Sequence, residues 1–108
     1  MIGEADIQPG ICGFRTRARA ETTDGRSVSI ALETDCDNVT RFAALLEEQS
    51  PLDAYNEINP RTENTVLAAG RQGMCCTDCI VPASALKALR VAAELAFAKD
   101  AIVEISVS

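Results

Sequence analysis

The chain has 108 residues, a length that suits one domain with its own core and is too short for two. Its formal net charge of -6 makes nucleic acid an unfavourable partner, because the surface repels phosphate backbones. No apolar stretch reaches the roughly twenty residues of a membrane span, and residues 1–10 lack the pattern of a secretion signal. We therefore predict a single domain over residues 1–108, soluble and cytoplasmic, with no membrane partner.

The first predicted elements are strands. Residues 4–8 can form a short strand that Pro9-Gly10 would end. Residues 14–20 and 28–32 alternate polar and apolar side chains on either side of Asp24-Gly25, which predicts a β-hairpin. One side of this hairpin would face solvent through Arg15, Arg17 and Arg19, and the other would face the core through Phe14, Ala18, Val28, Ile30 and Leu32.

Helices are predicted after the hairpin. Asp37-Asn38 can cap a helix whose apolar side chains recur at helical spacing, namely Val39, Phe42, Ala43 and Leu46. A brief second helix would begin at Ser50-Pro51 and end near Asn59-Pro60. A third would cover residues 62–69, with Gly70 as its C-terminal cap. Pro82 opens the last and longest helix, one face of which carries Leu86, Leu89, Ala93 and Phe97.

The last segment, residues 101–107, alternates again and is expected to be a strand that joins the hairpin sheet. The predicted fold class is therefore α+β: a small antiparallel or mixed sheet, made of the N-terminal hairpin and the C-terminal strand, with helices packed on one face. The last helix also has a side of small residues that permits close contact, either within the monomer or in a homodimer: Ala85, Ala88, Ala92 and Ala96.

Five cysteines and the absence of histidine define the chemistry that the chain offers. An odd number of cysteines cannot all pair internally as disulfides, and clustered cysteines in a reducing compartment are more often metal-binding or catalytic than structural. Without histidine there is no imidazole to act as a ligand, a general base or the activator of a cysteine nucleophile. The sulfurs must therefore act alone, as thiolates.

The cysteines lie at predicted junctions between elements. A turn enters the first hairpin strand at Cys12, the second strand leads into a helix at Cys36, and Cys79 precedes the last helix. Cys12 and Cys36 would return to the same end of the sheet. The N–H groups at helix N-termini would favour the thiolates of Cys36 and Cys79. Cys76 and Cys79 also form a Cys-x-x-Cys, a spacing found in zinc and iron-sulfur sites.

We therefore expect a four-sulfur site made by Cys12, Cys36, Cys79 and either Cys75 or Cys76. Thiolate ligands favour zinc, Fe2+ or an iron-sulfur cluster over magnesium or calcium, and the sequence leaves the choice among these open. Gly13 and Gly73 would let the backbone approach the sulfurs.

Two other classes of function stay open beside this non-enzymatic binder. The first is a thiol enzyme or redox protein that uses Cys76 and Cys79, adjusted by Asp78 or Lys87. The second is a protein-interaction module, with a homodimer as one form, in which the cysteines are small buried hydrophobes of the core.

Three stretches together resemble an uncharacterised family of small prokaryotic cysteine proteins: Gly10-Ile11-Cys12-Gly13-Phe14, Cys36 at a helix start, and Cys79-Ile80-Val81-Pro82 before Leu86-Lys87-Ala88-Leu89. Members typically read Cys-Pro-Val-Pro, so Ile80 departs from their pattern. More distantly, the order of the cysteines is similar to iron-sulfur scaffold proteins of the NifU/IscU type and to the TSCPD domain.

The scaffold likeness implies a role in cluster or metal handling. It would assign Cys12, Cys36 and Cys79 to the three scaffold cysteine positions, with Cys75 or Cys76 adding a fourth sulfur. The scaffold family's aspartate near its first cysteine has no counterpart beside Cys12.

Overall fold

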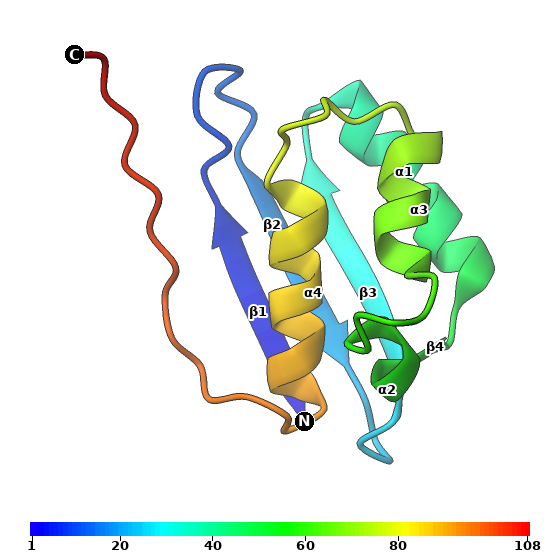
Figure 1. Cartoon of the computed structure of the whole chain (residues 1–108). Coiled ribbons are helices and arrows are strands. Elements are labelled where there is room, and N and C mark those ends of the chain that lie inside the picture. Colours follow the sequence, from blue (N-terminus) through cyan, green and yellow to red (C-terminus); the bar gives the residue numbers. More distant parts are fainter.

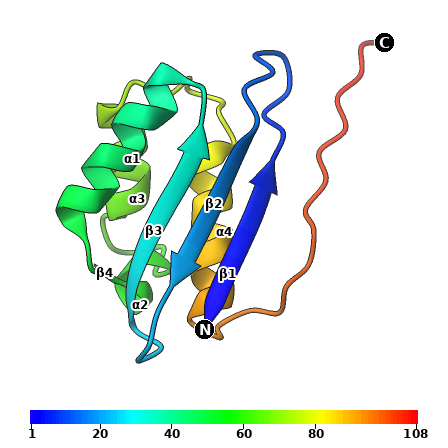
Figure 2. The same cartoon turned by 180° about the vertical axis from the view of Figure 1, so that it is seen from behind.

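The computed structural model describes residues 1–108 and shows one antiparallel sheet with helices on one face (Figure 1). Seen from behind, the other face of the sheet carries no helix (Figure 2). Four strands lie side by side in chain order: β1 (Ile2–Ile7), β2 (Thr16–Glu21), β3 (Ser27–Thr34) and β4 (Leu52–Asp53). The helices are α1 (Asp37–Gln49), α2 (Ala54–Glu57), α3 (Thr65–Gln72) and α4 (Val81–Ala92). The predicted α+β class is confirmed.

The predicted hairpin forms as β2 and β3. The short strand predicted before it forms as β1, which pairs with β2 along its whole length. On the solvent face, Arg17 lies opposite both Asp6 and Glu33, and Arg19 lies opposite Glu4. Opposite charges on neighbouring strands stabilise such a face. Arg17 and Arg19 therefore belong to a charge-paired solvent face of the sheet.

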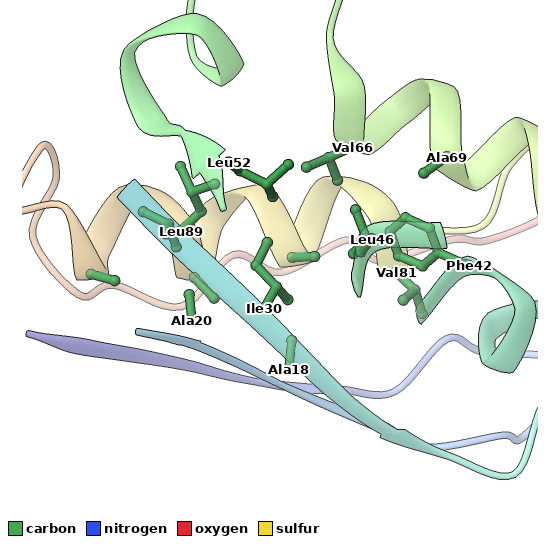
Figure 3. Close-up of a cluster of buried hydrophobic side chains, with 14 of the residues drawn as sticks. Ala18, Ala20, Ile30, Phe42, Leu46, Leu52, Val66, Ala69, Val81 and Leu89 are labelled. Carbon is green, nitrogen blue, oxygen red and sulfur yellow. The ribbon is translucent and has the colours of Figure 1, made fainter. Parts of the chain in front are cut away.

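The core lies between the sheet and the helices and contains mostly aliphatic side chains, with Phe42 as its one aromatic residue (Figure 3). Helix α4 packs very closely on β1 at Gly3. A Cβ added at this glycine would lie 2.2 Å from the Ala88 carbonyl oxygen, so only glycine fits there. The small-residue side of α4 is buried at Ala85, Ala88 and Ala92. Contacts within the monomer thus account for most of this side.

The helix boundaries differ from the prediction in the middle of the chain. Ser50-Pro51 starts no helix, because β4 comes first and Asp53 then caps α2 by accepting the Tyr55 N–H. Helix α3 starts after Asn64, whose side chain accepts the Leu67 N–H. It then runs through Gly70 instead of ending there.

No helix in the chain has the length and apolar character that crossing a bilayer requires.

The predicted C-terminal strand is wrong. Residues 101–107 are exposed, belong to no strand and share no backbone hydrogen bond with the sheet. Helix α4 ends at Ala92, and the chain turns away at Glu94, where φ is 61°. Phe97 therefore lies in solvent and not on a helix face. The expected inward orientation of Phe14 is also wrong, because this residue precedes β2 in an exposed loop.

Chain topology gives a physical reason why the tail stays out of the sheet. Figure 1 shows the helices in front of the sheet, β3 pointing up, and the tail rising on the far side of β1. A strand added there would be parallel to β3, and the crossover that leads to it from β3, through β4 and the helices, would be left-handed. Such connections are right-handed in about 98% of known cases. Alternation alone does not reveal this constraint.

Candidate functional site

All five cysteines lie at one end of the molecule, which we call the cysteine end. Figure 1 shows the β1–β2 loop, the start of α1 and the α3–α4 loop together at the top of the view. The first loop carries Cys12, the residue before α1 is Cys36, and the α3–α4 loop carries Cys75, Cys76 and Cys79. Three segments distant in sequence thus bring their sulfurs to the same end of the fold.

Burial divides these five free thiols into two groups. Cys36, Cys75 and Cys79 are half-buried and pack against the hydrophobic core. Cys12 and Cys76 are exposed. The cysteine end therefore has an inner group of three sulfurs, one from the β3–α1 junction and two from the α3–α4 loop, with two further sulfurs on its solvent side.

Cys36 is held by the geometry of a helix start. It is the N-cap residue of α1, and its carbonyl accepts the Thr40 N–H at 2.9 Å. Its own N–H donates to the Thr34 hydroxyl at 3.1 Å. The thiol makes no capping hydrogen bond, so the backbone is fixed while the sulfur stays available. The expected capping by Asp37-Asn38 is replaced by this arrangement, since Asp37 is already the first helical residue.

Cys75 is tied to two helices. Its N–H donates to the Gly70 carbonyl in α3 at 3.1 Å, directly after Met74, which adopts a left-handed φ of 63°. Its thiol lies 3.8 Å from the carbonyl oxygen of Asn38, in the first turn of α1. This weak contact places the Cys75 sulfur beside the helix start that carries Cys36.

The Cys-x-x-Cys is closed by a turn, because the Cys79 N–H donates to the Cys76 carbonyl at 2.9 Å. Ile80 then caps α4, and Pro82 follows within the first helical turn. The two cysteines are thus held on one short turn, with Cys79 facing the core and Cys76 facing solvent.

Arg41 also helps to fix the α3–α4 loop. Its Nε donates to the Gly73 carbonyl at 3.2 Å. Its positive charge acts to lower the pKa of Cys75, whereas burial and the neighbouring cysteine charges raise that pKa more strongly. No motif around Arg41 singles it out in the sequence. Its role follows only from the three-dimensional contact with a loop 32 residues away.

The pKa values of two inner thiols are raised. Burial, followed by the like charges of Cys79, Cys36 and Cys76, raises the pKa of Cys75 to about 11. Burial also raises the pKa of Cys79, while the Val81 N–H lowers it, and the neighbouring cysteine charges raise it further. The expected net stabilisation of the Cys79 thiolate by a helix start is therefore wrong, because desolvation outweighs it.

The sulfurs do not form a finished cage. No three cysteine, aspartate or glutamate side chains lie close enough together to hold a metal ion. Residues 73–80 between α3 and α4 form a loop, so this segment would have to move to bring its sulfurs onto one ion. Metal binding is commonly coupled to such ordering, because a finished site rarely exists before the cation binds.

The glycines near the cysteines serve other purposes than expected. A Cβ at Gly73 would lie 2.8 Å from the Phe42 backbone nitrogen, so Gly73 permits α3 to approach α1. Gly13 adopts a left-handed φ of 72°, and a Cβ there would meet nothing within 4 Å. Neither glycine is needed to bring backbone against a sulfur.

Exposed apolar side chains surround the thiols at the cysteine end. We call this set the apolar rim, and it comprises Ile11, Phe14, Met74 and Ile80. Ile11 is fully exposed, and Met74 is 71% exposed. Acidic side chains also lie there at Asp35, Asp37 and Asp78, without a salt bridge.

The surface also has a groove away from the cysteines. An open groove of about 530 Å³ runs between the α2–α3 loop and α4 and contains no cysteine. Its lining mixes the basic side chains of Arg71, Lys87 and Arg90 with the carboxylates of Glu57 and Glu63. It therefore offers no field of a single sign, and the reactive side chains of the molecule are at the cysteine end instead.

Comparison with known proteins gives one match. A family model described as a family of unknown function (DUF6951) matches residues 3–105. No curated protein and no solved structure matches the chain. The predicted membership of an uncharacterised family is confirmed, whereas the likeness to NifU/IscU-type scaffolds and to the TSCPD domain has no support from these comparisons and stays a prediction.

Proposed function

The chain belongs to DUF6951, a family of unknown function, and we propose that it binds a soft metal ion or an iron-sulfur cluster at its cysteine end. Cys36, Cys75 and Cys79 would supply three sulfurs, and Cys12 or Cys76 the fourth. One observation carries this proposal: three half-buried thiols, contributed by two distant segments, lie at the same end of the fold beside two exposed ones.

The electrostatics of the inner thiols support a cation as the ligand. The sulfurs are near enough that the charges of Cys36, Cys76 and Cys79 raise the pKa of Cys75. Several thiolates cannot gather here without a counter-charge, whereas a bound cation replaces the protons and removes the repulsion. With no histidine in the chain, the ligand set would be sulfur-rich, which favours zinc, Fe2+ or a cluster.

The apolar rim supports retention of such a ligand. Ile11 and Phe14 come from the loop of Cys12, and Met74 and Ile80 come from the loop that holds three further cysteines. Apolar side chains near a thiolate site limit water access and strengthen charge interactions within it. A loop movement that closes the site would bury part of this rim.

A thiol redox function is the second candidate, and the turn that joins Cys76 to Cys79 favours it. A redox dithiol needs an accessible thiolate with a lowered pKa. Burial raises the pKa of Cys79, and the chain has no histidine to activate either thiol. The metal or cluster function therefore has the stronger physical support.

The proposal is tested by elemental analysis and visible absorption of protein purified without oxygen, and again after anaerobic reconstitution with zinc or with iron and sulfide. We expect near-stoichiometric metal, and we expect Cys36→Ser, Cys75→Ser and Cys79→Ser each to lose most of it, because each removes an inner sulfur. One of Cys12→Ser and Cys76→Ser should also lose metal, and that result would identify the fourth ligand.

Thr77→Ser is a suitable control, because it changes an exposed side chain in the same loop without touching a thiol. Metal-free protein after reconstitution would contradict the proposal. If only the Cys76 and Cys79 variants differ from wild type, and only under oxidising conditions, the redox function would be favoured instead.

A further inference from the structure

The C-terminal tail, residues 96–108, has the sequence of a strand without a strand partner. Four β-branched side chains within it are almost fully exposed: Ile102 at 81%, Val103 at 73%, Ile105 at 92% and Val107 at 97%. The segment 101–107 alternates and contains neither glycine nor proline, which is typical of a strand. Contiguous exposed apolar side chains are a feature of interaction surfaces.

The family match includes most of this tail, because it runs to residue 105. The tail is therefore part of the domain that defines the family.

The sheet has a matching free edge at β1, which pairs only with β2. Met1 and Thr22 exchange both of their backbone hydrogen bonds, at 2.6 and 3.1 Å. Because hydrogen-bonded pairs alternate along an antiparallel ladder, the N–H and C=O groups of Ile2, Glu4 and Asp6 point away from β2. This edge holds no proline and no bulge, which are two of the devices that protect an edge from a further strand, and its charged side chains are Glu4 and Asp6.

The tail is poorly suited to the edge of its own chain. Seated beside its own β1, it would create the left-handed crossover from β3 described above, which is rare in proteins. A second molecule imposes no such constraint, because its tail reaches the edge from outside the fold. The eight residues 93–100 can span up to about 26 Å, so the tail can extend well away from the end of α4.

We propose that residues 101–107 of one copy add as a strand to the free β1 edge of a second copy, so that two chains exchange tails in a homodimer. Val103, Ile105 and Val107 would share the face toward the helices, and Glu104 would face solvent. Glu104 would lie on the solvent face next to Glu4 and Asp6, whose charges are balanced by Arg19 and Arg17 on β2. The proposal does not depend on the cysteine end or on its ligand.

The experiment measures molar mass by sedimentation equilibrium under reducing conditions, which exclude disulfide-linked dimers. We expect the full chain to have twice the mass of one chain. A tail-less chain ending at residue 99 and the full-length Ile105→Lys variant should both have the mass of one chain. Retention of the fold in each variant is checked by circular dichroism.

The edge is tested separately with Glu4→Pro. This substitution removes an N–H from the free edge while leaving the bonds to β2, because the Glu4 N–H points away from β2. It should yield monomers, whereas Glu4→Ala, which keeps the N–H, should remain dimeric. A dimer that survives both the tail deletion and Glu4→Pro would overturn the proposal.

Mixing the two monomeric variants distinguishes exchange between chains from docking within one chain. The tail-less chain offers an edge and the Glu4→Pro chain offers a tail, so the mixture should form a complex of two chains. If the full chain is monomeric at every concentration tested, or if the mixture forms no complex, the proposal is overturned and the tail acts within its own molecule or not at all.

Discussion

At the scale of single residues, Cys75 illustrates how the fold sets the chemistry of a thiol. Burial and like-charge neighbours raise its pKa from 9.0 to about 11. The folded chain therefore holds this proton more tightly than the unfolded chain does. The resulting contribution to stability is complete below pH 9.0, the ordinary value, and is lost as the pH rises toward about 11.

We predict that the free energy of unfolding of the reduced, metal-free protein falls as the pH rises from 9.0 to about 11, and that Cys75→Ser makes this fall shallower. Urea unfolding across this pH range measures the effect. Cys12→Ser is the matched control, since the Cys12 thiol is exposed, and it should keep the steeper fall. Equal pH dependence in wild type and Cys75→Ser would contradict the assignment.

At the scale of elements, the start of α3 depends on a residue outside the helix. Glu57 is 3% exposed and accepts the Thr65 N–H at 3.1 Å and the Val66 N–H at 2.7 Å. One carboxylate therefore satisfies two N–H groups of α3 and favours the positive end of that helix. The sequence did not reveal this role, because Glu57 lies eight residues before α3 in a stretch expected to be helical for other reasons.

Glu57→Ala should lower the free energy of unfolding by roughly 1–3 kcal/mol, because it leaves buried N–H groups without an acceptor. Glu57→Gln should cost less, since the amide oxygen can still accept. Urea unfolding with Glu47→Ala as an exposed control measures the difference. An unfolding midpoint of Glu57→Ala equal to that of the control would show that α3 does not depend on this carboxylate.

At the scale of the whole molecule, the sequence predicted those elements whose periodicity and partners are both local. The hairpin and α1 formed near the expected residues, because alternation or helical spacing there is continuous. The tail alternates equally well, but whether a strand finds a partner depends on the direction and order of strands already in the sheet. Phe97 was misplaced for a related reason, since apolar spacing continues past the turn at Glu94 that ends α4.

The candidate site was predictable in composition and in part of its placement. The cysteines occur at junctions of elements. The start of β2 and the end of β3 lie at the same end of the sheet, because these two strands are antiparallel. Other features of the site depend on how α1 and α3 pack. These are the division into inner and exposed thiols, the contact of Cys75 with Asn38, and the hydrogen bond from Arg41 to Gly73. Those contacts join residues 37 and 32 positions apart, which local patterns cannot connect.

X-ray absorption spectroscopy of the metal-loaded protein is the decisive test of the sulfur site, because it identifies and counts the atoms bound to the metal. We expect the metal to be coordinated by sulfur, at about 2.3 Å for zinc, with no imidazole contribution. The sulfur count should fall by one in any inner-cysteine variant that still retains metal. Coordination by oxygen without sulfur would contradict the proposed site and show that the metal binds away from the cysteine end.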